Sequence, residues 1–229
     1  MVNVNKVIDT MNNIIDSNNI SEIESHKYDD EIVNGAHVLS DYDLYSKRKT
    51  YCVERCWTII TPKLIEEMVN FIGNRKVVEI MAGTGYLSGL LKQHMDDNGI
   101  NSDNITAYDD MSWYKSKTVG KLWSYKGKVV VTPYEGIPDI SSADIVLLTW
   151  PPYKDTTCLE YLKQMKSGQI LIYNGEGYGG CTGTDEMYDL LEDQFDPYDP
   201  TSYGVYEPFS TVTKVWSGIH DSWYIYVKK

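Results

Sequence analysis

The chain has 229 residues, of which 42% are hydrophobic and 24% are charged, and its formal net charge is −12 at pH 7. This length allows one α/β domain with a sizeable core plus a terminal extension. No apolar run reaches the ~18–20 residues of a membrane span, and the N-terminus lacks the basic and apolar zones of a signal peptide. We therefore expect a cytoplasmic protein. The acidic balance argues against an extended nucleic-acid footprint, because such surfaces are ordinarily basic.

The four cysteines, Cys52, Cys56, Cys158 and Cys181, form no CxxC pair, and no histidine stands at zinc-ligand spacing. We expect reduced thiols and no metal site. Lys47, Arg48 and Lys49 form a basic cluster, interpreted as a solvated helix face with a local phosphate contact as the alternative.

Residues 1–55 are predicted to be an N-terminal helical extension, since apolar residues follow helical spacing over 4–17. Its tyrosines either form an aromatic lid or pack the extension onto the domain; they are Tyr28, Tyr42, Tyr45 and Tyr51. The domain proper is predicted to span 56–229. It opens with a helix that has Thr61 as N-cap, Pro62 in its first turn and Gly73 at its end.

From residue 76 onwards, short apolar runs alternate with helical stretches, a pattern that predicts a mostly parallel sheet with helices on both faces. The predicted strands are 77–81, 105–108, 129–132, 144–149 and 170–173, and the predicted helices are 86–95, 159–165 and 187–191. Two final β-branched, aromatic runs, 212–216 and 223–227, are joined by a turn too short for a parallel crossover. They are therefore predicted to pair as an antiparallel hairpin.

The segment from Glu79 to Gly85 is a strand running into a glycine-containing loop and a helix. Gly83 and Gly85 permit tight turning and close approach of a ligand. The acid Glu79 suits a cationic amino group and would repel a pyrophosphate. Asp109 follows 24 residues after Gly85 and ends the next strand, where a carboxylate can accept both hydroxyls of a ribose. Asp110 is the alternative for this role, and a structural turn without ligand is the alternative for the loop.

A buried strand ends in Trp150-Pro151-Pro152-Tyr153. Proline stiffens this turn, and Tyr153 offers an aromatic face to a planar or cationic acceptor.

With these segments, the chain resembles the class I S-adenosylmethionine-dependent methyltransferases. The resemblance implies a Rossmann-like α/β fold with a seven-stranded sheet. Members that methylate exocyclic amino groups of bases carry Asp or Asn before Pro-Pro, where this chain has Trp150. A closer resemblance is to a group of predicted methyltransferases, over the segments 56–62, 79–86, 150–153, 175–177, 180–183 and 218–221.

The predicted cofactor is S-adenosyl-L-methionine, held by Glu79, Met81, Ala82, Gly83, Thr84, Gly85, Asp109, Asp110 and Trp150. The predicted acceptor wall is Trp57, Trp150, Pro151, Pro152 and Tyr153. Trp57 has a core position as its alternative.

His220, Glu176 and Tyr153 are the candidates for catalysis or acceptor orientation. His220 lies in the last turn and is the natural base near pH 7, and Glu176 follows the fifth strand. The alternatives are an ordinary turn histidine and a solvent-facing loop acid.

The sequence thus predicts transfer of a methyl group to a nitrogen or oxygen of a modest-sized acceptor. The alternatives are a nucleic-acid base amino methyltransferase and a non-catalytic cofactor-binding scaffold. The acceptor and the oligomeric state stay open.

Overall fold

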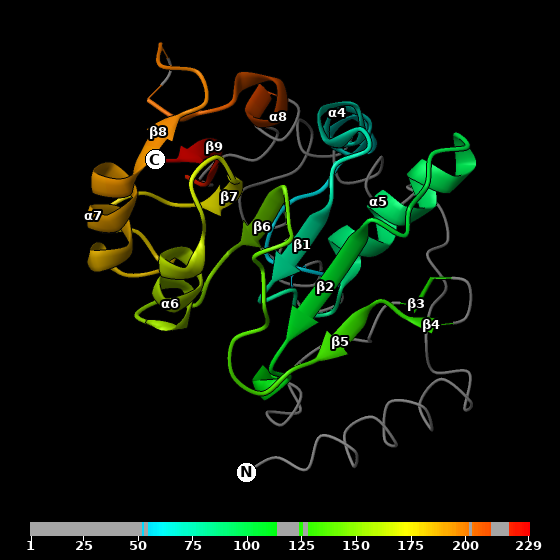
Figure 1. Ribbon diagram of the computed structural model, residues 1–229, viewed down its shortest axis with the longest axis horizontal. Helices are drawn as coiled ribbons and strands as arrows, with labels where there is room; N and C mark the ends of the chain where they lie inside the picture. The colour runs from blue at the N-terminus through cyan, green and yellow to red at the C-terminus, as the bar shows by residue number, and fades with distance from the viewer. Residues whose placement is uncertain (1–51, 53–54, 114–123, 126–127, 202, 212–219) are drawn as a thin grey trace, which may run out of the picture.

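The computed structural model describes residues 52, 55–113, 124–125, 128–201, 203–211 and 220–229 (Figure 1). The predicted aromatic lid, the basic cluster and the run 212–216 lie outside these residues, as does nearly all of the N-terminal extension. All four cysteines are described and are free thiols. In the described part of the chain, none of the helices has the length and hydropathy to cross a membrane.

The described strands form a seven-stranded sheet of order β5-β2-β1-β6-β7-β9-β8. Pairing is parallel from β5 to β7, and β9 runs antiparallel to both β7 and β8. The strands are β1 (Val77–Ile80), β2 (Ile105–Asp109), β5 (Val131–Pro133), β6 (Ile145–Thr149), β7 (Ile170–Gly175), β8 (Phe195–Pro197) and β9 (Ser222–Lys228). A separate two-stranded sheet pairs β3 (Ser124–Tyr125) with β4 (Lys128–Val129).

Helices cover both faces of the sheet (Figure 1). The first core packs α4 (Pro62–Ile72), α5 (Tyr86–Asp97) and α8 (Glu207–Thr211) against residues such as Val77 and Leu147. The second core packs α6 (Thr157–Gln164) and α7 (Asp185–Gln194) against residues such as Val78 and Leu148. Alternate residues of β1 and β6 thus enter different cores, as the period of two in a strand requires. The predicted fold class, a mostly parallel seven-stranded sheet with antiparallel C-terminal strands and helices on both faces, is confirmed.

The predicted start and end of α4 are also confirmed. The Thr61 hydroxyl accepts a hydrogen bond from the Leu64 N–H, and Pro62 is the first helical residue. Gly73 ends the helix at a φ of 56°, which glycine adopts without steric cost.

The predicted hairpin partner of the last strand, the run 212–216, lies outside the described residues. The predicted run 223–227 is β9, and its described neighbours on the two sides are β7 and β8. The three residues of β8 leave α7 directly and pair with the end of β9. A strand this short gives no alternation to read in the sequence, whereas the longer aromatic run 212–216 does. The antiparallel direction predicted for the last strand is confirmed, and its described partners are β7 and β8.

Candidate functional site

The glycine-containing loop and Asp109 meet at the carboxyl edge of the sheet. Because β1 and β2 are parallel and in register, with Ile80 beside Tyr108, both chains leave the sheet at this edge. The Gly83 N–H donates to Asp109 Oδ2 at 2.8 Å, and the Ala82 N–H donates to the Tyr108 carbonyl at 3.0 Å. The sequence prediction that these two elements form one site is therefore consistent with the geometry.

The two loop glycines serve different purposes. Gly85 has a φ of 78°, and a β-carbon there would lie 2.5 Å from Val131 Cγ2, so the loop needs this glycine to pack against β5. Gly83 has a φ of 55° and no atom within 4 Å of its missing side chain, so space is open beside it. Met81 holds a φ of 53°, a region that a long side chain seldom adopts and that collects at functional sites.

Glu79 is buried beneath the loop at 1% exposure, between β1 and α5. Its Oε2 accepts a hydrogen bond from the Ser88 hydroxyl at 2.5 Å. Burial raises the pKa of Glu79 to about 7; the Ser88 hydrogen bond opposes this shift and the charge of Asp109 adds to it. A buried acid that titrates near neutrality is a group that a cationic ligand can ionise.

Asp109 accepts three hydrogen bonds from the protein. Besides the Gly83 N–H, these come from the Met111 N–H at 2.7 Å and the Trp113 indole at 2.9 Å, both to Oδ1. Burial raises the pKa of Asp109 to about 6, against the lowering effect of the Gly83 and Met111 amides. The neighbouring Asp110 is exposed, and its carboxylate accepts from the Ser112 N–H at 2.8 Å. This geometry favours Asp109 over Asp110 as the group that organises the loop.

The segment before α4 is joined to the loop. The Thr84 hydroxyl donates to the Arg55 carbonyl at 2.7 Å, and Thr84 itself is buried. The Arg55 guanidinium lies 5.8 Å from the centroid of the Tyr86 ring, at the start of α5. Residues that precede the first helix therefore form one wall beside the candidate cofactor loop.

The turn after β6 carries Trp150 at a φ of 48°. Its N–H donates to the Asn174 carbonyl of β7 at 2.8 Å, which keeps the turn at the carboxyl edge. Pro151 is buried, and its carbonyl accepts from the Gly183 N–H at 3.0 Å. Pro152 and Tyr153 are exposed, and the Tyr153 ring lies 4.9 Å from the Lys154 ammonium. The rigid half of the predicted acceptor wall is thus Trp150 and Pro151.

Trp57 stacks on Trp150, with ring centroids 5.6 Å apart and planes inclined by 24°. Trp57 is 58% exposed, so the alternative of a core tryptophan is wrong. The Trp150 indole N–H donates to Asp221 Oδ2 at 3.2 Å. Because Ser222, the first residue of β9, pairs with Gly175, the preceding His220 and Asp221 lie at the same carboxyl edge. His220 is exposed there.

Glu176 belongs to a glycine-rich loop that folds on itself. Its carboxylate accepts from the Cys181 N–H at 2.5 Å, and its carbonyl accepts from the hydroxyls of Tyr173 and Tyr188. Thr182 bonds both tyrosine hydroxyls, at 2.9 Å and 3.1 Å. Burial raises the pKa of Tyr173 and of Tyr188, so both phenols stay protonated and hold the loop as hydrogen-bond donors. In this geometry Glu176 shapes its own loop.

Sequence reasoning missed Asn174, which joins four segments at this edge. Its side chain is buried, accepts from the Thr58 hydroxyl at 2.9 Å and donates to the Ser222 carbonyl at 3.2 Å. A polar residue at the end of an apolar strand is the signal that marks it, since a buried amide needs partners.

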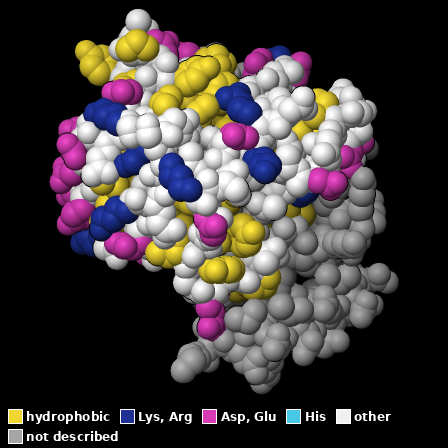
Figure 2. Space-filling model, in the orientation of Figure 1, with side chains coloured by type: hydrophobic (Ala, Val, Ile, Leu, Met, Phe, Trp, Pro, Cys, Tyr) yellow, Lys and Arg dark blue, Asp and Glu magenta, His cyan; other side chains and the backbone are white. Residues whose placement is uncertain are grey.

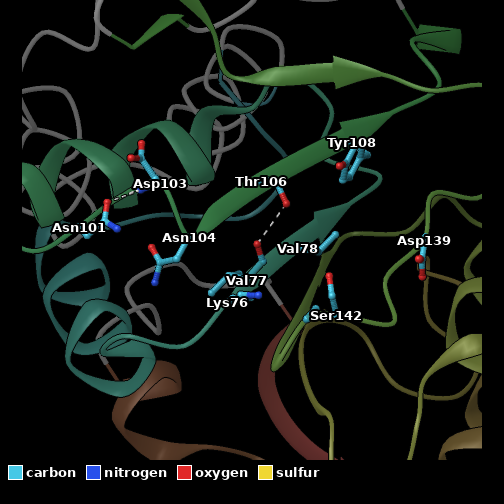
Figure 3. A pocket seen from close by; sticks show the side chains of 11 residues that line it. Lys76, Val77, Val78, Asn101, Asp103, Asn104, Thr106, Tyr108, Asp139 and Ser142 are labelled. Carbon is cyan, nitrogen blue, oxygen red and sulfur yellow. Dashed lines mark hydrogen bonds between the residues drawn. The ribbon is translucent and has the colours of Figure 1, made fainter.

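A cavity of about 390 Å³ lies elsewhere, along the face of β1 and β2 from their amino-terminal ends (Figure 3). Lys76, Asn104 and Ser142 are among its lining residues, and none of the predicted site residues lines it. The described connection from β5 to β6 contains no helix, which leaves this part of the sheet uncovered. Ligands of open α/β sheets bind beyond the carboxyl ends of the strands, so the cavity is distinct from the candidate site.

No protein-family model matches the chain, and no curated protein matches it in sequence. Among solved structures, a TehB-like SAM-dependent methyltransferase from Corynebacterium glutamicum is 11% identical, over 82% of this chain and 98% of its own, with a TM-score of 0.45. The N-methyltransferase NodS from Bradyrhizobium japonicum is 14% identical, over 72% and 92%, with a TM-score of 0.43. MtNAS in complex with S-adenosylmethionine is 12% identical, over 89% and 72%, also at 0.43. Likeness this distant concerns the backbone alone, and the chemistry of the site rests on its own residues.

Proposed function

We propose that the chain is an S-adenosylmethionine-dependent methyltransferase that acts on a nitrogen or oxygen of a modest-sized acceptor. One observation carries the proposal: two buried acids, Glu79 and Asp109, come from adjacent parallel strands, and Asp109 bonds the glycine loop at Gly83. S-adenosylmethionine has a cationic amino group, which suits Glu79, and a ribose, which suits Asp109.

The donor set fits the cofactor. The carboxylate of Glu79, once ionised, complements a cationic amino group. The two oxygens of Asp109 offer about four lone-pair sites, and three protein donors take three of them, so a ribose hydroxyl can donate to Oδ2. The open space beside Gly83 lets a ligand approach the backbone. When bound, the cofactor supplies an electrophilic methyl group on sulfur.

The protein's own part is alignment and exclusion of water, since methyl transfer is an in-line displacement. Trp150 and Pro151 provide the rigid part of an acceptor wall, and Trp57 stacks on Trp150. His220 lies exposed at the same edge, where a base serves a hydroxyl acceptor and is dispensable for a neutral amine.

The direct test is a calorimetric titration of the folded protein with S-adenosylmethionine and, separately, with ATP. We expect saturable heat with the first and none with the second, because Glu79 and Asp109 oppose a polyphosphate. Absence of heat at millimolar S-adenosylmethionine, with folding shown by circular dichroism, would refute the proposal.

A further inference from the structure

The starting observation is a carboxylate placed at the edge of a tryptophan. Asp221 and Trp150 are 71 residues apart, and the Trp150 indole N–H donates to Asp221 Oδ2 at 3.2 Å. Trp150 follows β6, the position where base-amino methyltransferases resembling this chain carry Asp or Asn. Asp221 immediately precedes β9, whose first residue lies beside the end of β7. The fold therefore places the carboxylate of Asp221 beside Trp150, where the turn itself has no acidic residue.

The second observation is the tryptophan pair itself. Trp57 lies on Trp150 at a centroid distance of 5.6 Å, and the 24° between their planes leaves the pair wedge-shaped. Trp57 is 58% exposed, so an outward movement of its ring removes little buried surface. The Trp150 main chain is held by its hydrogen bond to the Asn174 carbonyl, and the Trp150 ring is held by Asp221. One ring of the pair is thus fixed and the other is able to move.

We propose that a planar acceptor ring bearing an amino group inserts between Trp57 and Trp150 and donates an in-plane N–H to Asp221. This inference rests on the proposed methyltransferase function and names the acceptor class of the same site. An indole N–H lies in its ring plane, so Asp221 lies at the edge of Trp150. A ring stacked parallel to Trp150, about 3.5 Å away, presents its own in-plane N–H to the same carboxylate.

The chemistry balances with the groups at hand. The nitrogen lone pair forms the new N–C bond, the S–C bond breaks, and its electron pair stays on sulfur as a neutral thioether. The proton released from nitrogen passes to the Asp221 carboxylate and from there to solvent. A free ring suits this protein better than a long polyanion, because the net charge is −12. On the face shown in Figure 2, Lys and Arg side chains are interspersed with acidic ones.

The test uses cytidine and uridine, two nucleosides that differ by an amino group in place of a carbonyl, added to protein saturated with S-adenosylmethionine. Binding is measured by calorimetry and methyl transfer with labelled cofactor. We expect cytidine to bind at millimolar or lower concentration and at least about tenfold more tightly than uridine. Adenosine against inosine is the second pair. No binding of either amino-bearing nucleoside, or equal binding within both pairs, would overturn the inference.

Variants separate the roles. Asp221→Ala, which removes the accepting oxygens, should lower the affinity for cytidine about tenfold and remove its preference over uridine, with the affinity for S-adenosylmethionine changed less than twofold. Trp57→Ala should weaken both nucleosides equally. The matched control is D196A, since Asp196 is an exposed acid on β8, which pairs with the far end of β9. Unchanged cytidine preference in a folded Asp221→Ala protein counts against Asp221. Loss of S-adenosylmethionine binding in the parent chain instead counts against the proposed function.

Discussion

Glu79 and Asp109 are acids whose charged forms the fold disfavours, because burial is the first cause of both pKa shifts. The hydrogen bonds from Ser88, Gly83 and Met111 offset only part of that cost. Groups shifted in this way, in contact with a loop that has open space beside it, are typical of binding sites. A cationic ligand would supply the stabilisation that the protein alone does not.

Cofactor affinity should therefore depend on pH through Glu79. Below about pH 7 the acid is protonated and must release its proton before it can pair with an amino group, so affinity should rise about tenfold from pH 6 to pH 7.5. E79Q removes the titrating group, and its affinity should be at least tenfold weaker at pH 7.5 and nearly flat with pH. Calorimetry in buffers of different ionisation heat measures both, with E192Q, at an exposed position of α7, as the control. A parallel pH slope in E79Q would contradict this role.

Asp109 should act through the loop as well as through the sugar. In D109N, the side-chain oxygen can face the Met111 and Trp113 donors, which turns the amide nitrogen toward the Gly83 N–H, donor against donor. Loss of one hydrogen bond to a charged group costs about 1.5–3 kcal/mol. We expect cofactor affinity to fall at least tenfold in D109N and less than twofold in D110N. If cofactor affinity falls equally in D109N and D110N, Asp109 is not the preferred sugar-binding acid.

At the scale of elements, the loop between β1 and α5 depends on its contact with β5. In Gly85→Ala, the new β-carbon would lie 2.5 Å from Val131 Cγ2 at a φ of 78°. Backbone strain in the left-handed region, about 1 kcal/mol, and overpacking, about 1–3 kcal/mol, should together lower the free energy of unfolding. Gly99→Ala shares the positive φ, 70°, but meets open space, so it should cost only about 1 kcal/mol. Urea midpoints compare the two, and equal midpoints would show that packing against β5 is unimportant.

The sequence predicted those elements whose signals are local. The Thr61 cap, Pro62 and Gly73 bound α4 by rules that need only neighbouring residues, and apolar runs mark β1, β6 and β7. What could not be predicted depends on distant contacts. The β8 strand is three residues long, and its existence follows from pairing with β9.

The same division holds for the candidate site. The glycine loop and Asp109 could be proposed from the sequence because each lies where an apolar strand ends. Trp57 and Trp150, which stack, are 93 positions apart, and Trp150 and Asp221, which share a hydrogen bond, are 71 positions apart. No local sequence pattern predicts contacts between residues so far apart. Trp57 was predicted to share a wall with Trp150, but its exposure depends on how the segment before α4 crosses the sheet edge.

For the whole molecule, the two acids predict how stability varies with pH. The pKa of Glu79 rises from 4.5 to about 7 and that of Asp109 from 3.8 to about 6, so between these values the folded chain binds more protons than the unfolded chain. Stability of the cofactor-free protein should therefore fall as pH rises from about 4 to about 7 and change little from these groups above that. Glu79, fully buried, accounts for up to about 3 kcal/mol of this loss.

Self-repulsion from the net charge of −12 lowers stability in the same direction, and salt separates the two causes. Charges on the surface are screened at about 0.5 M salt, whereas a buried acid is screened much less. Denaturant midpoints at about pH 5.5 and about pH 8 should therefore keep a difference at high salt in the parent chain, and E79Q should remove most of it by raising stability at pH 8. Saturating S-adenosylmethionine should stabilise the parent chain more at pH 8 than at pH 5.5, because the bound cation pairs with the ionised acid. A difference that salt abolishes equally in both proteins would assign the pH dependence to the surface and leave Glu79 without an energetic role.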